Sequence, residues 1–280
     1  MTVDVMMPFY GDVAHFKQAV TSVVGQSDAD WRLVVVDDCY PDPEPARWLK
    51  TLDDSRITYL RNDNNLGVNG NFRRCVDLVA SDYFVVMGCD DVMAPDYLAT
   101  VKSLASANPG AAVIQPGVDV IDDAGMPVRP LGDRIKSRLA PSRATVLSGE
   151  VLACSLFHGN WTYFPSLLWR TSAVRAVGFR TGFDVVLDLA LLIDLTIDGG
   201  SLVYDPTVVF SYRRHGGSVS SIQAVDGRRF DEENRFFAEQ ADQCGERGWS
   251  KAARAARFHP TSRLNQAIQR TSAAIGRVRR

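Results

Sequence analysis

The segment 32–38 reads RLVVVDD, and the segment 83–91 reads YFVVMGCDD. Each begins with a short run of β-branched or aromatic residues that is apolar on both faces, which is typical of a strand buried in a parallel sheet. Each also ends in a pair of aspartates. In an open parallel sheet the carboxyl ends of the strands meet at one edge, where ligands bind. The two segments therefore predict a parallel sheet with an acidic site at that edge.

The flanking sequence alternates between strand and helix periods. Further strands are predicted at 3–8, 57–61 and 111–115, and helices at 13–24, 45–52, 70–79 and 94–107. This repeat predicts an α/β fold: a mostly parallel open sheet flanked by helices on both faces.

After residue 117 the alternation becomes irregular. Residues 120–145 contain three prolines among turn-forming and basic residues, so we expect a long excursion over one edge of the site. Beyond this segment, helices are predicted at 149–157, 171–177 and 186–197, and strands at 202–204 and 208–212. We therefore divide the chain into two halves of one domain (1–117 and 118–220) and a helical basic C-terminal extension (221–280).

The charge of the C-terminal tail differs from that of the rest. Residues 251–280 contain eight Lys or Arg and no Asp or Glu, which leaves about −10 for residues 1–250. Leu264, Ile268 and Ile275 fall on roughly one side of a helix. A basic, partly amphipathic segment of this kind favours peripheral contact with an anionic membrane. The alternative is a solvated tail, or one docked on an acidic partner or a second subunit.

Composition excludes several classes of protein. The 280 residues are 46% hydrophobic and 23% charged, as in globular proteins, and the net charge of −2 does not favour a nucleic-acid binder. The five cysteines are widely spaced and odd in number, which favours a reducing compartment over a disulfide framework or a zinc site. No signal peptide opens the chain, and no run of about 18 apolar residues occurs, because Asp188 and Asp194 interrupt the best candidate. We therefore expect a cytoplasmic protein, with any membrane contact at the inner face.

The two acidic pairs favour a divalent cation. Adjacent carboxylates repel each other unless a cation or hydrogen-bond donors compensate, and hard oxygen ligands favour Mg²⁺ or Mn²⁺. The alternative for each pair is an ordinary turn or helix-cap role. Two pairs at equivalent strand ends favour the metal interpretation.

Several stretches, in order, resemble one known family. They are Met7–Tyr10 (MPFY), VVVDDCYPD, RNDNNLGVNGNF and DYFVVMGCDDVMAPDYL, followed by VGFRTGFDVVLDLALLIDL and VFSYRRHGGSVS. Together they resemble the family 2 glycosyltransferases of the GT-A fold, over about residues 1–220.

The resemblance implies that 1–117 is the nucleotide-sugar-binding half and 118–220 the acceptor-binding and base-bearing half, with a nucleotide site at the start of the chain. It places Pro8, Phe9 and Tyr10 along the base and ribose, and Asp38 as the acceptor for the imide N–H of uracil or thymine. It also places Asn65 and Gly67 in a loop near the nucleotide, with Asn71 orienting that loop.

The resemblance also implies a metal site and a catalytic base. Asp90 and Asp91 match the family's acidic motif, so Asp90 is expected at the ribose, the metal or both, and Asp91 at the metal. His215 is expected beside the diphosphate and the metal, and Asp188 is expected to be the base, with Asp184 as the alternative. One departure is Gly88, where the family usually has Asp. Without it, the choice of main metal ligand between Asp90 and Asp91 stays open.

Two aromatic residues are candidates for the acceptor site. Trp161 and Tyr163 lie in the segment HGNWTYFPS, where they either stack on an acceptor sugar or pack under the site. His215 has a similar alternative, as a polar residue at the end of a strand.

These residues describe a coherent reaction. A divalent cation neutralises a nucleotide diphosphate leaving group, and a carboxylate takes the proton of the attacking hydroxyl. One base without a separate nucleophile means one displacement, and therefore inversion at the anomeric carbon.

The implied enzyme is an inverting glycosyltransferase that uses a UDP- or dTDP-sugar with Mn²⁺ or Mg²⁺. Its acceptor would be a saccharide or a lipid-linked sugar, in the biosynthesis of cell-envelope polysaccharide, glycolipid or glycoside. Two other interpretations stay open: a sugar nucleotidyltransferase and a non-catalytic nucleotide-sugar-binding module. The first usually shows a Gly-rich basic signature after strand one, where this chain has PFYGDVAHF. A homodimer also stays open.

Overall fold

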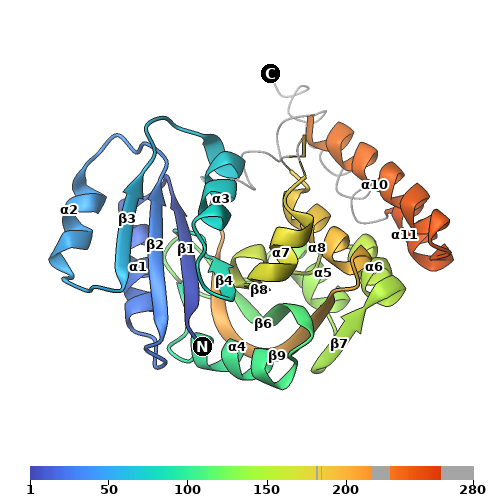
Figure 1. The fold of residues 1–280 in the computed structure, drawn as a ribbon, viewed down its shortest axis with the longest axis horizontal. Helices are drawn as coiled ribbons and strands as arrows, with labels where there is room; N and C mark the ends of the chain where they lie inside the picture. The colour runs from blue at the N-terminus through green and yellow to red at the C-terminus, as the bar shows by residue number, and fades with distance from the viewer. Residues whose placement is uncertain (181, 184, 216–227, 260–280) are drawn as a thin grey trace.

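One mixed sheet organises the molecule (Figure 1). The structure is a computed structural model, and it describes residues 1–180, 182–183, 185–215 and 228–259. In these ranges the sheet has nine strands in the order β3-β2-β1-β4-β8-β6-β9-β5, and β7 pairs with β9. The strands are β1 (Val3–Phe9), β2 (Trp31–Asp37), β3 (Ile57–Arg61), β4 (Tyr83–Val86), β5 (Val92–Met93), β6 (Ala111–Ile121), β7 (Thr145–Ser148), β8 (Leu168–Arg170) and β9 (Ser201–Arg213).

The first four strands of that order are parallel, as predicted. β6 and β9 form a second parallel pair. Between these two groups lies β8, which runs antiparallel to both β4 and β6 and which the sequence analysis did not predict. The short strands β5 and β7 run antiparallel to β9. The predicted α/β fold, a mostly parallel open sheet flanked by helices, is confirmed.

Helices cover both faces of the sheet because successive side chains of a strand point to opposite faces. One core cluster joins Val3, Val5 and Met7 of β1 to α1 and α4, and the other joins Met6 of β1 to α3, α6 and α8. The helices are α1 (Val13–Val24), α2 (Glu44–Thr51), α3 (Gly67–Asp77), α4 (Tyr97–Ala107), α5 (Leu131–Leu139), α6 (Gly149–His158), α7 (Thr171–Val177), α8 (Leu187–Ile197), α10 (Arg228–Glu246) and α11 (Ser250–Phe258), with a short 3₁₀ turn at Phe164–Ser166.

The segment 120–145 is more regular than expected. β6 continues to Ile121, α5 follows Pro130, and β7 begins at Thr145. Asp122 stabilises the intervening turn, because its Oδ1 accepts from the N–H groups of Ala124 and Met126. The prolines therefore separate short elements instead of marking an irregular excursion.

The two strands predicted at 202–204 and 208–212 form the single strand β9. The register between β6 and β9 shifts around Gly117. A Cβ at Gly117 would collide with the carbonyl of Pro206, so only glycine lets the two strands approach each other at this irregularity. The proposed domain limit at residue 117 falls inside β6.

The described part of the C-terminal extension is helical and packed. Phe236 and Phe237 of α10 and four alanines of α11 (Ala252, Ala253, Ala255 and Ala256) are buried in the core cluster that contains α6. The residues Leu264, Ile268 and Ile275 lie outside the described residues. Among the helices of the described ranges, none is both long and apolar enough to cross a bilayer.

Candidate active site

The two aspartates that follow β2 have different surroundings. Asp37 is fully buried, and its carboxylate accepts from the Tyr40 N–H at 2.6 Å, from the Tyr59 hydroxyl and from Arg61 at 3.2 Å. Burial and the neighbouring carboxylate raise the pKa of Tyr59 to about 12. Asp37 is therefore a structural residue, and Asp38 is the member of the pair that faces the predicted nucleotide loop.

Asp38 and Asn71 hold that loop together. Asp38 Oδ1 accepts from Asn62 Nδ2 at 2.9 Å and from the Leu66 N–H at 2.8 Å. Asn62 Nδ2 also donates to Asn71 Oδ1 at 3.0 Å, and Asn71 Nδ2 donates to the Val36 carbonyl at 2.8 Å. The structure thus brings the predicted Asp38 and Asn71 together, and adds Asn62 as a residue that the sequence analysis missed.

Asn65 and Gly67 lie at the exposed end of this loop. Asn65 Oδ1 accepts from the Gly67 N–H at 2.9 Å, which closes a turn before α3. Gly67 has a φ of +71°, a left-handed conformation that suits glycine. Both residues are therefore accessible where the chain turns into α3.

The three residues at the end of β1 are not equally accessible. Phe9 is fully buried, and its ring packs 4.3 Å from that of Phe16 and 5.0 Å from that of Tyr40, measured between centroids. Its ring therefore belongs to the core, and only the Phe9 backbone can line a ligand. Tyr10 is 56% exposed and Pro8 is partly buried, so these side chains can contact a nucleotide.

The second acidic pair lies beside the predicted histidine. His215 Nε2 is 2.8 Å from Asp90 Oδ2. Asp91 is 1% exposed, and its Oδ1 accepts from the Arg213 backbone N–H at 2.8 Å. Burial and the charge of Asp90 raise the pKa of Asp91. The structure therefore brings Asp90, Asp91 and His215 together, in the arrangement that the family resemblance implies.

The donor set at Asp91 fits a divalent cation. Asp91 Oδ2 is buried and has no hydrogen-bond partner in the described structure, and a hard cation satisfies such an oxygen. Within the described ranges, His, Cys, Asp and Glu side chains do not form a group of three that could hold a metal ion. The protein residues fit a partial ligand set, of the kind that Mg²⁺ completes with water and substrate phosphates.

Gly88 makes room for this arrangement. A Cβ at this position would lie 2.5 Å from Asp91 Oδ2 and 2.9 Å from Asp90 Oδ1. Both distances are shorter than any normal contact of a Cβ atom. Glycine at position 88, where the family usually has Asp, therefore leaves room for the two carboxylates at these positions.

Arg213 joins the acidic pair to other parts of the fold, and the sequence analysis missed it. Its guanidinium is buried and donates to the carbonyls of Asp90 at 2.6 Å, Asp122 at 3.1 Å and Asp123 at 3.0 Å. A further bond reaches Gln18 Oε1 on α1 at 2.8 Å. Its position at the end of an apolar strand could not reveal these distant partners.

Asp188 lies in the first turn of α8. Its Oδ2 accepts from Asn160 Nδ2 at 3.0 Å, and its Oδ1 accepts from the Leu189 N–H at 2.7 Å. Burial raises the pKa of Asp188, while the Lys136 ammonium opposes that rise. Burial in turn lowers the pKa of Lys136 to about 8. A carboxylate with a raised pKa is suited to act as a general base. The alternative base, Asp184, lies outside the described residues.

Helix α5 links the Asp188 side of the site to the His215 side. Asp133 is buried, and its carboxylate accepts from the Tyr163 hydroxyl at 2.9 Å and from Arg214 at 2.5 and 2.9 Å. Lys136, one turn further along α5, has its Nζ 4.5 Å from the centre of the Tyr163 ring. Tyr163 therefore lines the candidate site. Asp133 and Lys136 were not predicted because they fall in the segment 120–145, which was expected to be irregular. Arg214 was not predicted because it stands beside His215, to which the motif drew attention.

Trp161 packs under the site and does not face it. It is 2% exposed, its Nε1 donates to Ser155 Oγ at 3.0 Å, and its ring meets that of Tyr204 edge-on. Of the two alternatives for this residue, the structure favours packing, and its ring is not available to stack on an acceptor sugar.

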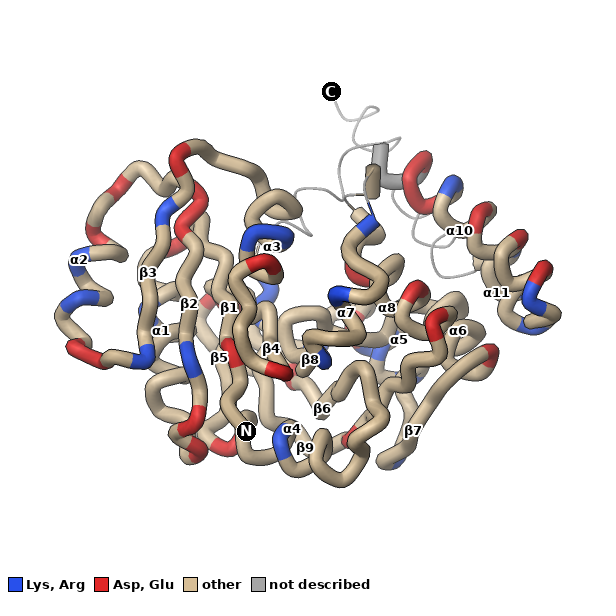
Figure 2. Tube along the Cα trace, in the orientation of Figure 1, with Lys and Arg blue, Asp and Glu red and all other residues tan. Residues whose placement is uncertain are grey.

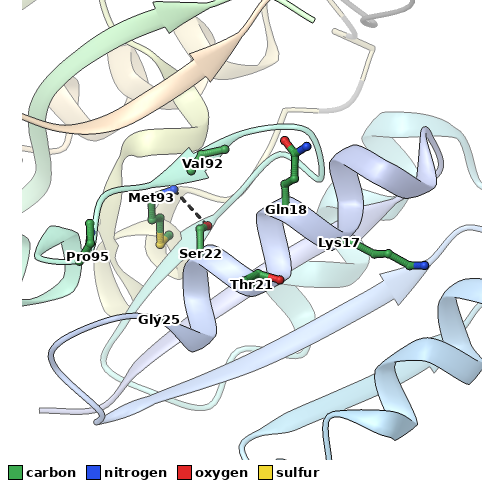
Figure 3. A pocket seen from close by; sticks show the side chains of 8 residues that line it. All are labelled: Lys17, Gln18, Thr21, Ser22, Gly25, Val92, Met93 and Pro95. Carbon is green, nitrogen blue, oxygen red and sulfur yellow. Dashed lines mark hydrogen bonds between the residues drawn. The ribbon is translucent and has the colours of Figure 1, made fainter. Parts of the chain in front are cut away.

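A separate hollow of about 520 Å³ lies between α1 and β5 (Figure 3). It is lined by Lys17, Gln18, Thr21, Ser22, Gly25, Val92, Met93 and Pro95. None of the predicted site residues lines it, so the chemistry described above does not belong to this hollow.

Comparison with known proteins places the chain among glycosyltransferases. The family model described as "Glycosyl transferase family 2" matches residues 4–162, which is more than half of the chain. The succinoglycan biosynthesis protein ExoO of Rhizobium meliloti is 24% identical over 219 residues, which are 78% of this chain and 62% of ExoO. Another curated relative, 29% identical, is matched over 23% of its length. The chain thus spans less than two thirds of the length of these relatives.

Solved structures with the same fold have low sequence identity. Residues 1–349 of Staphylococcus aureus TarS, in complex with UDP-GlcNAc, give a TM-score of 0.67 at 13% identity, over 85% of this chain and 66% of TarS. The mannosyltransferase PcManGT of Pyrobaculum calidifontis, in complex with GDP-Man and Mn²⁺, gives 0.64 at 16% identity, over 98% of this chain and 75% of PcManGT. At these identities the likeness concerns the fold.

Proposed function

The chain belongs to glycosyl transferase family 2, and on that premise we propose that it is an inverting, metal-dependent glycosyltransferase. It moves a sugar from a nucleotide diphosphate sugar to an acceptor hydroxyl. The observation that carries this proposal is the buried, unpartnered Oδ2 of Asp91, next to Asp90 and His215 at the carboxyl ends of the strands. When bound there, a divalent cation neutralises the diphosphate leaving group.

The loop held by Asp38 supports a nucleotide pocket. Asp38 is fixed by Asn62 and Leu66 through one carboxylate oxygen. A uracil or thymine base would donate its imide N–H to this carboxylate, while the exposed Tyr10 lies over the base or ribose. This preference for UDP or dTDP is our proposal for this chain; TarS was solved with UDP-GlcNAc and PcManGT with GDP-Man.

Asp188 takes the proton of the acceptor hydroxyl. Asn160 and the Leu189 N–H orient its two oxygens, and burial keeps its pKa above the ordinary value, which makes it a stronger base. The reaction needs no protein nucleophile, so the hydroxyl displaces the nucleotide in one step and inverts the anomeric centre.

Tyr163 and Lys136 contribute to the acceptor side of the site, with Asp133 holding Tyr163. We propose a saccharide or a lipid-linked sugar as acceptor, in the biosynthesis of a cell-envelope polysaccharide, glycolipid or glycoside. The name of ExoO, a succinoglycan biosynthesis protein, is consistent with a polysaccharide product.

The exposed side of α11 supports a peripheral membrane contact through residues 251–280. Lys251, Arg254 and Arg257 are exposed and recur every three residues, and Phe258 is 61% exposed next to them. Such a basic surface would attract anionic lipid and would hold the enzyme near a lipid-linked acceptor.

A thermal-shift panel of nucleotide diphosphates and their sugars, with and without Mn²⁺, tests the donor site. We expect Mn²⁺-dependent stabilisation that is confined to UDP or dTDP compounds, and release of the free nucleotide diphosphate on turnover. Formation of a sugar nucleotide from a nucleoside triphosphate would instead identify a nucleotidyltransferase. Binding without turnover, for every donor and acceptor supplied, would leave the non-catalytic module.

A further inference from the structure

The helix that carries Asp188 is capped by a residue from the C-terminal extension. Glu232 of α10 accepts from the Val185 N–H at 2.6 Å and from the Val186 N–H at 3.0 Å, both through Oε1. These amides immediately precede α8, which begins at Leu187. Glu232 lies 46 residues from Val186 in sequence, and α10 lies outside the segment 4–162 matched by the family model.

This contact satisfies two amides at the start of α8 from a distant part of the chain. The first N–H groups of a helix have no partner within the helix, and a polar side chain at the N-cap usually accepts from one of them. The N-cap of α8 is Val186, which has no side-chain acceptor. A carboxylate near a helix N-terminus is also favoured by the helix dipole. Glu232 accepts from the N-cap amide and from the amide before it, and so it supplies from a distance the contact that the glutamate of a capping box makes with the N-cap amide locally.

Other residues of α10 contact the segment that precedes α8. Arg235, one turn after Glu232, donates to the Gly182 carbonyl. The ring of Phe236 meets that of Phe183 edge-on, with 5.7 Å between the centroids. Figure 2 shows several acidic positions along α10, and Glu232 among them bonds to the amides that precede α8. The described residues that precede α8 are therefore held against α10.

The first turn of α8 in turn orients the candidate base. One carboxylate oxygen of Asp188 is held by Leu189 N–H within that turn, and the other by Asn160 from outside it. The two bonds can form together only while the turn keeps its position relative to Asn160. A displacement of about 1 Å at a reacting group can lower a rate about 100-fold.

From these contacts we propose that Glu232 is a positioning residue for Asp188, so that the C-terminal helix α10 completes the catalytic half of the site. The inference rests on the proposed function, because it takes Asp188 to be the base. The donor side of the site is formed by Asp38, Asp90 and Asp91, whose carboxylates bond to Asn62, the Leu66 N–H, His215 and the Arg213 N–H. Loss of the cap therefore reduces turnover and leaves donor binding intact.

Three variants test the proposal. Glu232→Ala removes the acceptor, Glu232→Gln keeps an Oε1 that can accept from both amides, and Asp242→Ala is a matched control at an exposed acidic position on the same helix. Two measurements are made on each full-length protein. The first is amide hydrogen exchange over residues 185–190, which does not depend on activity. The second is kcat and donor KM for release of the nucleotide diphosphate, as a function of pH.

We expect Glu232→Ala to exchange at least about tenfold faster over 185–190 and to lose about 10- to 100-fold in kcat, with donor KM unchanged. The acid limb of its kcat against pH should move to lower pH, because an Asp188 that is less buried has a pKa nearer the ordinary value. The Lys136 ammonium and Asn160 Nδ2 also act on this carboxylate. Glu232→Gln should stay close to the wild type, and Asp242→Ala should match it.

Two results would overturn the proposal: exchange and kcat in Glu232→Ala equal to those of Asp242→Ala, or an equal loss of kcat and donor affinity that Glu232→Gln does not restore. If the wild type turns over no donor, the proposed function fails instead. The exchange data still test the contact between Glu232 and the start of α8 in that case. Faster exchange in Glu232→Ala but not in the other two variants supports the contact, and unchanged exchange refutes it.

Discussion

The backbone N–H of Arg213 donates to Asp91 Oδ1 at 2.8 Å, across 122 residues of sequence. The side chain of Arg213 also donates to the carbonyl of Asp90. The end of β9 therefore fixes both the main chain and one carboxylate of the acidic pair, and leaves the second oxygen of Asp91 as the unpartnered group.

Arg213→Met should destabilise the fold. The change removes the guanidinium that donates to the carbonyls of Asp90, Asp122 and Asp123, and each hydrogen bond lost from a charged group costs about 1.5–3 kcal/mol. We expect the free energy of unfolding in urea to fall by about 3 kcal/mol or more. Arg129→Met, at an exposed position, is the control, and an equal free energy for both variants would contradict the role of Arg213.

Asp91→Asn should separate metal binding from folding. The amide keeps an oxygen for the Arg213 N–H and removes a buried charge whose Oδ2 has no hydrogen-bond partner, so the melting temperature without metal should be unchanged or higher. The additional stabilisation by UDP with Mn²⁺ and the transfer activity should both be lost. Asp119→Asn, at an exposed position on β6, should keep both. Full turnover by a folded Asp91→Asn protein would refute the metal assignment.

Asp188→Asn should keep donor affinity and lose about 10²–10⁴-fold in kcat, because a general base contributes about this factor. The measurement is single-turnover transfer alongside titration of the nucleotide diphosphate. Asp184→Asn is the comparison. An inactive Asp184 variant beside an active Asp188 variant would transfer the role of base to Asp184.

Lys136→Met should change the pH dependence of the reaction. The ammonium of Lys136 lowers the pKa of Asp188, against the effect of burial, so its removal raises that pKa further. Since the base acts in its deprotonated form, the acid limb of kcat against pH should move to higher pH. Arg134→Met, on the exposed side of α5, should leave the limb in place. A limb that does not move in the Lys136 variant would show that this charge does not act on the base.

Truncation after His259 should weaken attachment to anionic liposomes. It keeps α11, whose buried alanines a cut after Ser250 would remove from the core, and it deletes five arginines. Each basic residue near an anionic surface contributes about 1 kcal/mol, so flotation of the full chain should be stronger and should decrease with salt. Equal flotation of both proteins would eliminate the tail as a membrane contact.

The sequence by itself determined the layout of the first half of the fold. The Val-rich runs that became β1 and β2 are buried on both faces, and a local apolar run is sufficient to predict such strands. The positions of Asp38, Asp90 and Asp91 followed, because parallel strands place their carboxyl ends at one edge. The apolar helix with Asp188 in its first turn was predicted for the same reason, since its buried pattern is local.

Only the tertiary structure decided which distant groups meet. Periodicity predicts that a residue is on a buried or an exposed face, but not which strand will pair with it, and so the antiparallel β8 and the continuous β9 were missed. The same limit hid Arg213, Asp133, Lys136 and Glu232, whose partners lie far away in sequence. It also hid the burial of the Phe9 and Trp161 rings, which are adjacent in sequence to site residues but are packed into the core. A polar contact between remote segments depends on how the strands and helices pack together, so local residue patterns do not encode it.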